Sequence, residues 1–383
     1  MPKSLRYEIG PIRPPSEAYS LLVRFTRNCP WNKCEFCHIY KGKKFERRPL
    51  DEIKADIDTV REIRDQITAL SCEQGEGGTI TEAVVEKCFS GTSNEYTRSV
   101  AVWLYFGARH VFIQDANSLV MKVDEMAEAL RYLTKSLPSI ERVTSYARSQ
   151  TIAQRFSVED LGRLRDAGLT RLHIGLESGS DPLLKLMKKG VTKEEHVLAG
   201  RRIKEAGIEL SEYVVPGLGG RKWWREHALE TADALNRINP DFIRFRTLKV
   251  TRDMPLYKKI ESGDFELEHD EEILRELRFL MEHLEGVTSY VKSDHILNLL
   301  EEVEGKLPED KAKMLAVIDT YFALGHEQRL VYRLGRRAGV YRSTDDLKDE
   351  LAYYRFKKLL QEMEAKEPGS AERQLSLLLD HYI

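Results

Sequence analysis

Three cysteines lie within nine residues of one another, and their spacing suits the binding of a metal cluster. Cys29, Cys34 and Cys37 form the pattern Cys-x4-Cys-x2-Cys directly after the apolar run 21–25. Three closely spaced thiolates match three corners of a cubane iron–sulfur cluster, and they leave the fourth iron open to a small molecule. The alternative is a zinc site. That site would need His38 as its fourth ligand, and the direct neighbour of Cys37 is poorly placed to close a tetrahedron.

The composition is that of a water-soluble globular protein. Apolar residues make up 42% of the 383 residues and charged residues 32%, which suits a chain with a sizeable core. No run approaches the roughly 18 apolar residues that span a bilayer, and the first residues form no apolar signal segment. The net charge of −2 gives no general attraction to a phosphate backbone. We expect a cytoplasmic protein without membrane or nucleic-acid partners.

Two further cysteines, Cys72 and Cys88, flank a glycine-rich stretch. They are too few to ligate a second cluster of their own. We expect them to be unrelated thiols of a reducing compartment.

Strand-like runs alternate with helical patterns along the first two thirds of the chain, which is typical of parallel βα units. Six such runs occur, at 21–25, 110–113, 142–146, 171–174, 210–215 and 242–248. Six units are too few for a closed eight-stranded barrel. The sequence therefore predicts an α/β fold, a partial (β/α)6 TIM-like barrel whose strand carboxyl ends share one face.

Capping patterns and apolar spacing predict the helices. An apolar stripe begins after Pro49, Ser157 with Asp160 forms a capping box, and Thr192 with Glu195 forms another. The segment 71–98 shows no such pattern and is expected to be a loop-rich insertion.

The texture of the sequence changes in its last third. Apolar stripes at helical spacing occur at 274–284, 296–300, 314–324 and 351–360. We expect an amino-terminal extension at 1–19, the barrel at 20–255, and a carboxy-terminal helical appendage at 256–383. The sequence leaves open whether this appendage covers the barrel mouth or packs on its side.

Polar residues follow several of the predicted strands, where a site would be built. Asp115 and Asn117 follow the second strand and Tyr146 and Arg148 end the third, while the stretch Gly-Leu-Glu-Ser-Gly-Ser at 175–180 follows the fourth. A carboxylate can accept hydrogen bonds from two neighbouring hydroxyls, and an ammonium group such as that of Lys189 can neutralise a carboxylate. Ordinary turns and helix caps at these positions remain the structural alternative.

The sixth strand carries Arg244 and Arg246 two residues apart, so that both would share one face. If that face points inward, the two arginines form a clamp for an anionic substrate. If it points outward, they are solvated charges.

Together these motifs resemble the radical SAM superfamily. Its commoner spacing is Cys-x3-Cys-x2-Cys, so this chain carries one extra residue before Cys34, and it keeps an aromatic residue, Phe36, before the last cysteine. Residues 175–190 resemble elongator-type and methylthiotransferase-type members. Asp-Ala-Asn at 115–117 stands where Gly-Gly-Glu is usual.

The resemblance implies a [4Fe–4S] cluster on the three cysteines and S-adenosylmethionine (SAM) on its open iron. It places the methionine amino group near the segment after strand two, the ribose near the fourth strand, the carboxylate near a basic residue and adenine near the fifth strand. The implied cofactor contacts are Phe36, Asp115, Asn117, Glu177, Ser178, Lys189, Val215 and Gly217.

The resemblance also implies the reaction class. Reductive cleavage of SAM would give a 5′-deoxyadenosyl radical that abstracts hydrogen from an unknown small-molecule substrate. Flavodoxin or ferredoxin would supply the electron. Tyr146, Arg148, Arg244 and Arg246 are the candidate substrate contacts, and no catalytic side chain is assigned. The alternative is a haem or iron–sulfur carrier built on the same shell.

Overall fold

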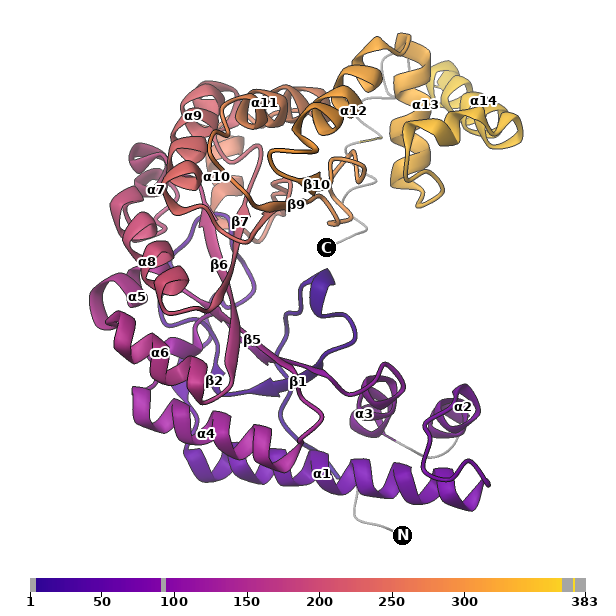
Figure 1. Cartoon of the computed structure of the whole chain (residues 1–383). Helices are drawn as coiled ribbons and strands as arrows, with labels where there is room; N and C mark the ends of the chain where they lie inside the picture. Colours follow the sequence, from indigo (N-terminus) through magenta and orange to yellow (C-terminus); the bar gives the residue numbers. More distant parts are fainter. Residues whose placement is uncertain (1–4, 91–93, 367–374, 376–383) are drawn as a thin grey trace. The chain divides into compact units, whose positions relative to one another are not determined.

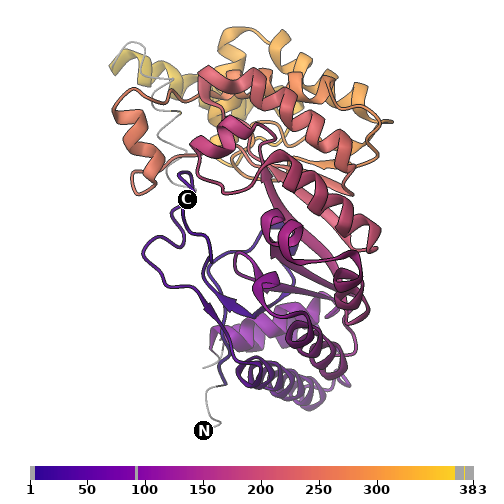
Figure 2. The ribbon, with the colours of Figure 1, turned by 90° about the vertical axis from the view of Figure 1, so that its left-hand side faces the viewer.

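Parallel strands followed by helices form the framework of the protein. The computed structural model describes residues 5–90, 94–366 and 375 (Figures 1 and 2). By its internal contacts the chain divides into two units. The first comprises the residues up to Lys33, Ile39–Gly175 and Leu198–Leu210, and the second comprises Cys34–His38, Leu176–Val197 and the residues from Ser211 onward.

Four parallel strands lie side by side in the first unit, in the order β1-β4-β5-β6. They are β1 (Leu21–Arg24), β4 (His110–Gln114), β5 (Arg142–Ala147) and β6 (Leu169–Glu177, whose last two residues belong to the second unit). A short antiparallel pair, β2 (Thr26–Arg27) and β3 (Glu46–Arg47), flanks the cysteine segment.

Six helices occur among the described residues of the first unit. They are α1 (Leu50–Glu73), α2 (Glu82–Ser90), α3 (Glu95–Tyr105), α4 (Val123–Ser136), α5 (Ser149–Arg155) and α6 (Val158–Asp166), with 3₁₀ turns η1 (Pro15–Glu17) and η2 (Ser118–Val120). Ile53, Ile57 and Val60 begin the buried stripe of α1, and their three- and four-residue spacing puts them on one helix face. The long α1 packs against α4 (Figure 1).

The second unit contains the remaining strands, in the order β7-β8-β9-β10. These are β7 (Glu209–Val214, which begins in the first unit), β8 (Phe242–Phe245), β9 (Tyr290–Lys292) and β10 (Gly305–Lys306). The first three are parallel, and β10 is antiparallel to β9.

Helices of the second unit lie between these strands and also follow the last of them in the sequence. They are α7 (Asp181–Leu186), α9 (Gly220–Ile238), α10 (Pro255–Glu261), α11 (Asp270–Glu282), α12 (Lys311–Ala323), α13 (His326–Arg337) and α14 (Glu350–Lys366), with the 3₁₀ turn η3 (Thr344–Lys348). Helix α8 (Lys193–Glu205) runs from the second unit into the first. None of the helices built from the described residues is both long and apolar enough to cross a bilayer.

The α/β fold class predicted from the sequence is confirmed, and all six predicted βα strands occur in order. The predicted caps are present as well. Ser157 and Asp160 form a reciprocal capping box at the start of α6, and the N–H of Thr192 donates to Glu195 ahead of α8. The proposed boundaries after residues 19 and 255 stay predictions.

The prediction of a loop-rich insertion at 71–98 was wrong. The end of α1, all of α2 and the start of α3 lie within it, and residues 91–93 lie outside the described part. Val84 and Cys88 are buried one helical turn apart, and Asn94 caps α3 by accepting the N–H of Thr97. Helices α5 and α13 were also not predicted.

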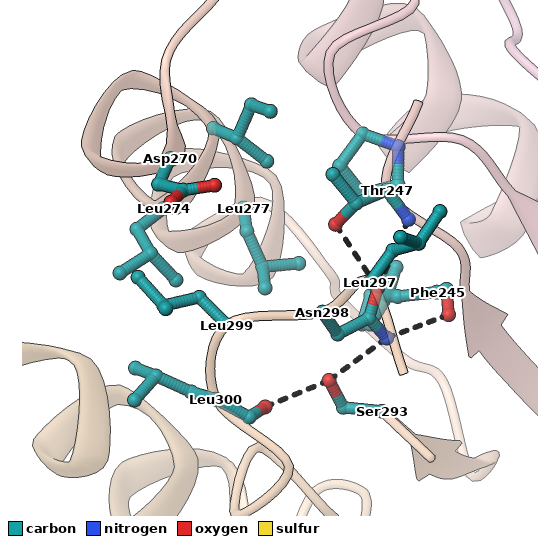
Figure 3. A pocket seen from close by; sticks show the side chains of 12 residues that line it. Phe245, Thr247, Asp270, Leu274, Leu277, Ser293, Leu297, Asn298, Leu299 and Leu300 are labelled. Atoms are coloured by element: carbon teal, nitrogen blue, oxygen red, sulfur yellow. Dashed lines mark hydrogen bonds between the residues drawn. The ribbon is translucent and has the colours of Figure 1, made fainter. Parts of the chain in front are cut away.

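The predicted helical stripe at 296–300 is likewise wrong, because this segment after β9 has no helix. The Asn298 side chain instead donates to the carbonyl oxygen of Phe245 at 2.8 Å and accepts the N–H of Thr247 at 2.9 Å (Figure 3). Such side-chain bonds offer the backbone an alternative to a helix. The pocket beside Asn298 has a volume of about 10 Å³, which is room for one water at most.

Candidate functional site

A buried carboxylate anchors the cysteine segment in the first unit. Asp115 is fully buried just after β4. Its Oδ2 accepts Nε of Arg24 at 2.6 Å and the N–H of Asn28 at 2.7 Å, while Oδ1 accepts the Tyr40 hydroxyl at 3.1 Å. Asn28 directly precedes Cys29, and Tyr40 comes three residues after Cys37. One carboxylate therefore holds both ends of the cysteine segment.

The approach to Asp115 is tight enough to require a glycine. A Cβ atom on Gly10 would lie 2.8 Å from Oδ1 of Asp115. The amino-terminal segment can pass this close only without a side chain.

The extra residue of the Cys-x4-Cys spacing falls in a turn made by asparagines. Asn28 and Asn32 both have left-handed backbones, with φ of 68° and 48°, a conformation that asparagine tolerates better than most residues. The N–H of Asn32 donates to Sγ of Cys29 at 3.3 Å, and its side chain donates to the carbonyl oxygen of Tyr40. These bonds give the longer loop a defined path.

The other predicted residues of the first unit also have structural partners. Asn117 donates to Oγ1 of Thr151 at 2.8 Å and accepts the N–H of Arg148 at 3.3 Å. The Arg148 guanidinium lies 5.0 Å from the centre of the Trp31 ring, within cation–π range. Tyr146 packs edge-on against Phe112. Asn117, Arg148 and Trp31 thus connect the end of β5 to the cysteine segment.

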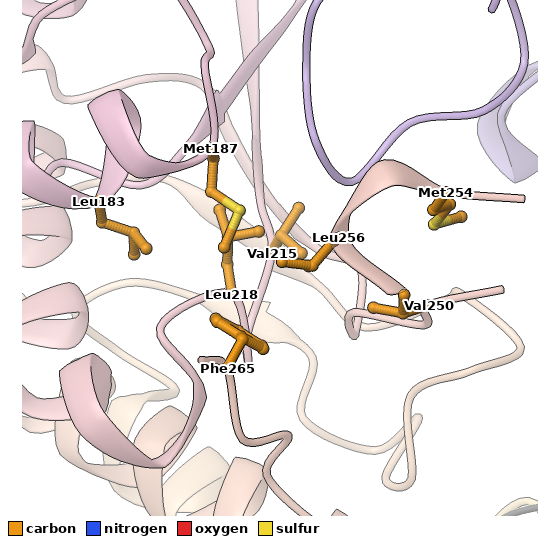
Figure 4. Close-up of a cluster of buried hydrophobic side chains, with 8 residues drawn as sticks. All are labelled: Leu183, Met187, Val215, Leu218, Val250, Met254, Leu256 and Phe265. Carbon is orange, nitrogen blue, oxygen red and sulfur yellow. The ribbon is translucent and has the colours of Figure 1, made fainter. Parts of the chain in front are cut away.

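In the second unit, the residues around Phe36 are held through their backbone. Glu35 donates its N–H to the carbonyl oxygen of Met187 at 3.0 Å and accepts the N–H of Leu256 at 2.9 Å. Its buried carboxylate lies 2.5 Å from Nζ of Lys188. Phe36 packs against an apolar cluster (Figure 4), whose buried members are Leu183, Met187, Val215, Leu218, Val250, Met254, Leu256 and Phe265.

Glu177 and Lys189 form an ion pair next to this cluster. Lys189 Nζ lies 2.8 Å from Oε1 of Glu177, and the two side chains are only 11% and 15% exposed. The same ammonium lies 6.0 Å from the centre of the Phe36 ring. Glu177 has a left-handed backbone, with φ of 63°, and such a conformation persists only where the surroundings enforce it.

The serines after Glu177 build a tight turn. Oγ of Ser178 accepts the N–H of Ser180 at 3.0 Å, and Ser180 caps α7 by accepting the N–H of Leu183. A Cβ on Gly179 would lie 2.1 Å from the carbonyl oxygen of Glu230. The turn and helix cap that the sequence offered as the structural alternative at 175–180 are therefore present, and the turn directly follows Glu177.

The segment after β7 is tied to Glu177 as well. The N–H of Val215 donates to the carbonyl oxygen of Glu177 at 3.1 Å. Gly217 adopts a φ of 86°, which favours glycine. Phe36, Glu177, Ser178, Lys189, Val215 and Gly217 therefore all belong to the second unit, with Cys34 and Cys37, whereas Cys29, Asp115 and Asn117 belong to the first.

The two arginines predicted as an anion clamp differ in their surroundings. Arg244 is buried, and its guanidinium donates to Oγ of Ser211 at 3.1 Å and to Asp294 at 3.0 Å. Its charge is already neutralised within the protein. Arg246 lies beyond the end of β8 and is exposed.

The cysteine donors are present as thiols, because none of the five cysteines forms a disulfide. Cys29, Cys34 and Cys37 are half-buried, Cys72 is exposed and Cys88 is buried. Within the described residues, no three side chains of His, Cys, Asp or Glu are close enough together to hold a metal ion. The donor chemistry fits an iron–sulfur cluster, and the ligand assignment stays a prediction.

Comparison with known families identifies the chain. The model of the radical SAM superfamily matches residues 23–232, which is more than half of the 383 residues and includes all three clustered cysteines. The chain belongs to the radical SAM superfamily. The resemblance predicted from its motifs is confirmed.

Curated relatives of this radical SAM chain cover part of it. The tRNA uridine(34) acetyltransferase of Methanocaldococcus infernus is 23% identical over 159 residues, which are 38% of this chain and 29% of the relative. The corresponding protein of Methanocaldococcus jannaschii is 23% identical over 122 residues, 30% and 22% of the two chains. The chain thus spans less than a third of either relative.

A solved structure matches over a greater length. The coproporphyrinogen III oxidase HemN of Escherichia coli, a radical SAM enzyme, is 12% identical with a TM-score of 0.44, and the match covers 95% of this chain and 90% of that one.

One candidate residue was missed by sequence reasoning. Glu212 on β7 is fully buried, and neither of its carboxylate oxygens has a hydrogen-bond partner among the residues that the structure describes. Burial raises its pKa well above the usual range, the charge of Glu177 raises it further, and Lys189 opposes this. Glu212 is thus a neutral acid near the Glu177–Lys189 pair. The sequence did not indicate a role for Glu212, because Glu177, whose charge acts on it in the fold, is 35 residues away in the sequence.

The raised pKa of Glu212 predicts a pH-dependent stability. The folded state keeps a proton that the unfolded state releases above pH ~4.5, so the free energy of unfolding falls as pH rises. Glu212→Gln removes this titration and should raise the melting temperature at pH 8.5 more than at pH 5.5. Thermal melts at both pH values check this. Glu128→Gln, at an exposed glutamate, serves as the control, and an equal effect of both substitutions would contradict the prediction.

Asp115 gives a second prediction. Asp115→Asn removes one of the two carboxylates that pair with Arg24, Glu8 being the other, and should lower stability by about 1.5–3 kcal/mol, the cost of losing hydrogen bonds to a charged group. It should also reduce the iron bound after reconstitution, because Asn28 and Tyr40 lose their common anchor. Denaturant unfolding and iron analysis provide the measurements. Asp124→Asn, at an exposed ion pair with Arg163, should change stability by less than about 1 kcal/mol. Equal iron contents in the two variants would refute the anchoring role.

Proposed function

We propose that Cys29, Cys34 and Cys37 hold a [4Fe–4S] cluster and that Glu177, Lys189 and the segment from Val215 to Gly217 bind SAM beside it. The observation that carries this proposal is the family match, which includes every one of these residues. When bound and reduced, the cluster supplies the electron that cleaves SAM to methionine and a 5′-deoxyadenosyl radical. The protein itself binds, orients and desolvates the ligand.

The residues of the second unit suit that task. The Glu177 carboxylate can accept the two ribose hydroxyls, and the Lys189 ammonium can pair with the methionine carboxylate of SAM. Both groups are mostly shielded from water beside the apolar cluster. Electrostatic contacts are stronger in such surroundings than in water. We also propose that Asp115 and Asn117 lie near the methionine amino group of SAM. Both residues make structural hydrogen bonds as well, Asp115 to the N–H of Asn28 and Asn117 to Thr151.

The substrate is proposed to be a small molecule that loses a hydrogen atom. Arg246 is the proposed contact for an anionic group, because it is exposed at the end of β8 while Arg244 is neutralised by Asp294. Tyr146 and Arg148 stay candidate contacts. A flavodoxin- or ferredoxin-type donor would supply the electron, in the cytoplasm.

Two alternatives are testable in the same assay. The curated relatives act on tRNA by name, so an RNA substrate competes with the small molecule, although the net charge of −2 does not favour it. A haem or cluster carrier would bind its cargo without cleaving SAM. Formation of 5′-deoxyadenosine after anaerobic reconstitution and reduction supports the enzyme. SAM binding with no cleavage, with or without added RNA, supports the carrier.

The cluster assignment predicts the effect of removing one thiol. Cys34→Ala should abolish the iron–sulfur absorption band and most of the bound iron, because a cubane with two protein ligands is poorly held. Cys72→Ala removes an exposed thiol outside the proposed site and should leave both unchanged. Iron and sulfide analysis after anaerobic reconstitution measures the difference. Full iron content in the Cys34 variant would rule out this ligand set.

The ribose contact predicts a separate effect. Glu177→Gln should weaken SAM binding about tenfold to a hundredfold, the usual effect of losing a hydrogen bond to a charged group. Cluster content should stay at the wild-type level. Calorimetric titration of the reconstituted protein with SAM measures this, and Glu194→Gln, at an exposed ion pair with Arg237, is the matched control. Unchanged affinity in the Glu177 variant would disprove the contact.

A further inference from the structure

Behind the predicted SAM segments lies a buried pair of titratable side chains, His227 on α9 and Glu276 on α11. Both are fully buried. His227 Nδ1 lies 2.9 Å from Oε1 of Glu276, and its Nε2 lies 3.1 Å from the carbonyl oxygen of Glu177. Because a carbonyl oxygen only accepts, Nε2 must carry a hydrogen. His227 thus connects the Glu276 carboxylate to the backbone of Glu177.

Glu276 also holds the second predicted segment. Its two oxygens lie 3.2 and 3.3 Å from the backbone N–H of Gly217, which donates to them. The Glu268 side chain also hydrogen-bonds to Glu276. A single buried carboxylate therefore binds Gly217 directly and Glu177 through His227.

The protonation states are consistent with this network. Burial lowers the pKa of His227, but the neighbouring Glu276 charge outweighs it and the pKa is raised. Burial and the Glu276 charge raise the pKa of Glu268 to about 10, Glu272 adds to this, and Arg221 opposes it. Glu268 and Glu276 then share one proton between them, and the imidazolium of His227 balances the remaining negative charge.

We propose that His227 and Glu276 are positioning residues that fix the two backbone segments proposed to bind SAM, one at Glu177 and one at Val215–Gly217. This inference rests on the proposed function, and neither side chain needs to touch SAM. The pair acts through the backbone groups that it holds.

The backbone of these segments shows why such a support is needed. Glu177 has a φ of 63° and Gly217 a φ of 86°, and a left-handed glutamate is stable only when its surroundings over-determine it. The Glu177 carbonyl oxygen accepts two donors, the N–H of Val215 and the imidazole of His227. Without His227, the Glu177 carbonyl oxygen keeps only the bond from Val215. The buried Glu276 carboxylate then also lacks its cationic partner.

The test uses His227→Gln, Glu276→Gln and the double variant in the full chain. Two readouts are amide hydrogen exchange of peptides that contain residues 177 and 217, measured without SAM, and calorimetric SAM binding to the reconstituted protein. We expect at least tenfold faster exchange in both peptides. We also expect about tenfold weaker SAM binding at unchanged iron content. His283→Gln, at a half-buried histidine near the end of the same α11, is the control.

Two results separate positioning from general destabilisation. Because the two residues act as one unit, the double variant should bind SAM no more weakly than either single variant. In the wild type, the His227 imidazolium stabilises the two segments, and this contribution is lost as the pH rises through the raised pKa of His227. SAM affinity of the wild type should therefore fall as the pH rises above 6.5, the ordinary pKa of histidine, and it should fall less steeply in His227→Gln, where only Glu212 and Glu268 still titrate beside these segments.

The wild-type protein provides a measurement that does not depend on the variants folding. ¹⁵N spectra of histidine-labelled protein should show His227 with both ring nitrogens protonated near neutral pH. An Nε2 without hydrogen would overturn the proposal. So would amide exchange rates at residues 177 and 217 that are the same in folded His227→Gln as in the wild type. If amide exchange at residues 177 and 217 is faster in the variants but the wild type binds no SAM, the positioning role is supported. The proposed function is then overturned instead.

Discussion

A carboxylate that is taken out of water is costly unless it finds hydrogen-bond donors, and this constraint applies to the candidate residues of each unit. Asp115 is fully buried in the first unit, and Glu276 is fully buried in the second. Each accepts the backbone N–H of a residue at a predicted cofactor segment: Asn28, next to Cys29, in one case and Gly217 in the other. The two buried carboxylates thereby fix the backbone positions of Asn28 and Gly217.

The apolar cluster complements these charges. Leu183, Met187 and Val215 pack with Phe36 beside the Glu177–Lys189 pair. Exclusion of water makes each hydrogen bond of the pair stronger, and it equally makes an unpartnered charge expensive. The cluster and the ion pair therefore depend on each other. Substitution on either side changes the electrostatics of the whole segment.

Much of the framework could be predicted because its signals are local. The capping box at Ser157 and the apolar stripe of α1 involve residues three or four positions apart. The wrong helix at 296–300 shows the limit, since Asn298 bonds to Phe245 and Thr247, about fifty residues earlier. The His227–Glu276 pair has the same separation. A sequence pattern gives no sign of partners that only the tertiary fold brings together.

Glu177 is where these separate interactions meet. Its side chain pairs with Lys189, its carbonyl oxygen accepts from Val215 and His227, and its backbone is left-handed. In the proposed complex, ribose hydroxyls would take the place of Lys189 at the Glu177 carboxylate. The ammonium would then turn to the carboxylate of SAM. Both charges would then have a partner before and after the exchange, as mostly buried charges require. In that proposal the Glu177 carboxylate and the Lys189 ammonium each exchange one partner for a group of SAM, and the hydrogen bonds from Val215 and His227 fix the Glu177 backbone that carries the carboxylate.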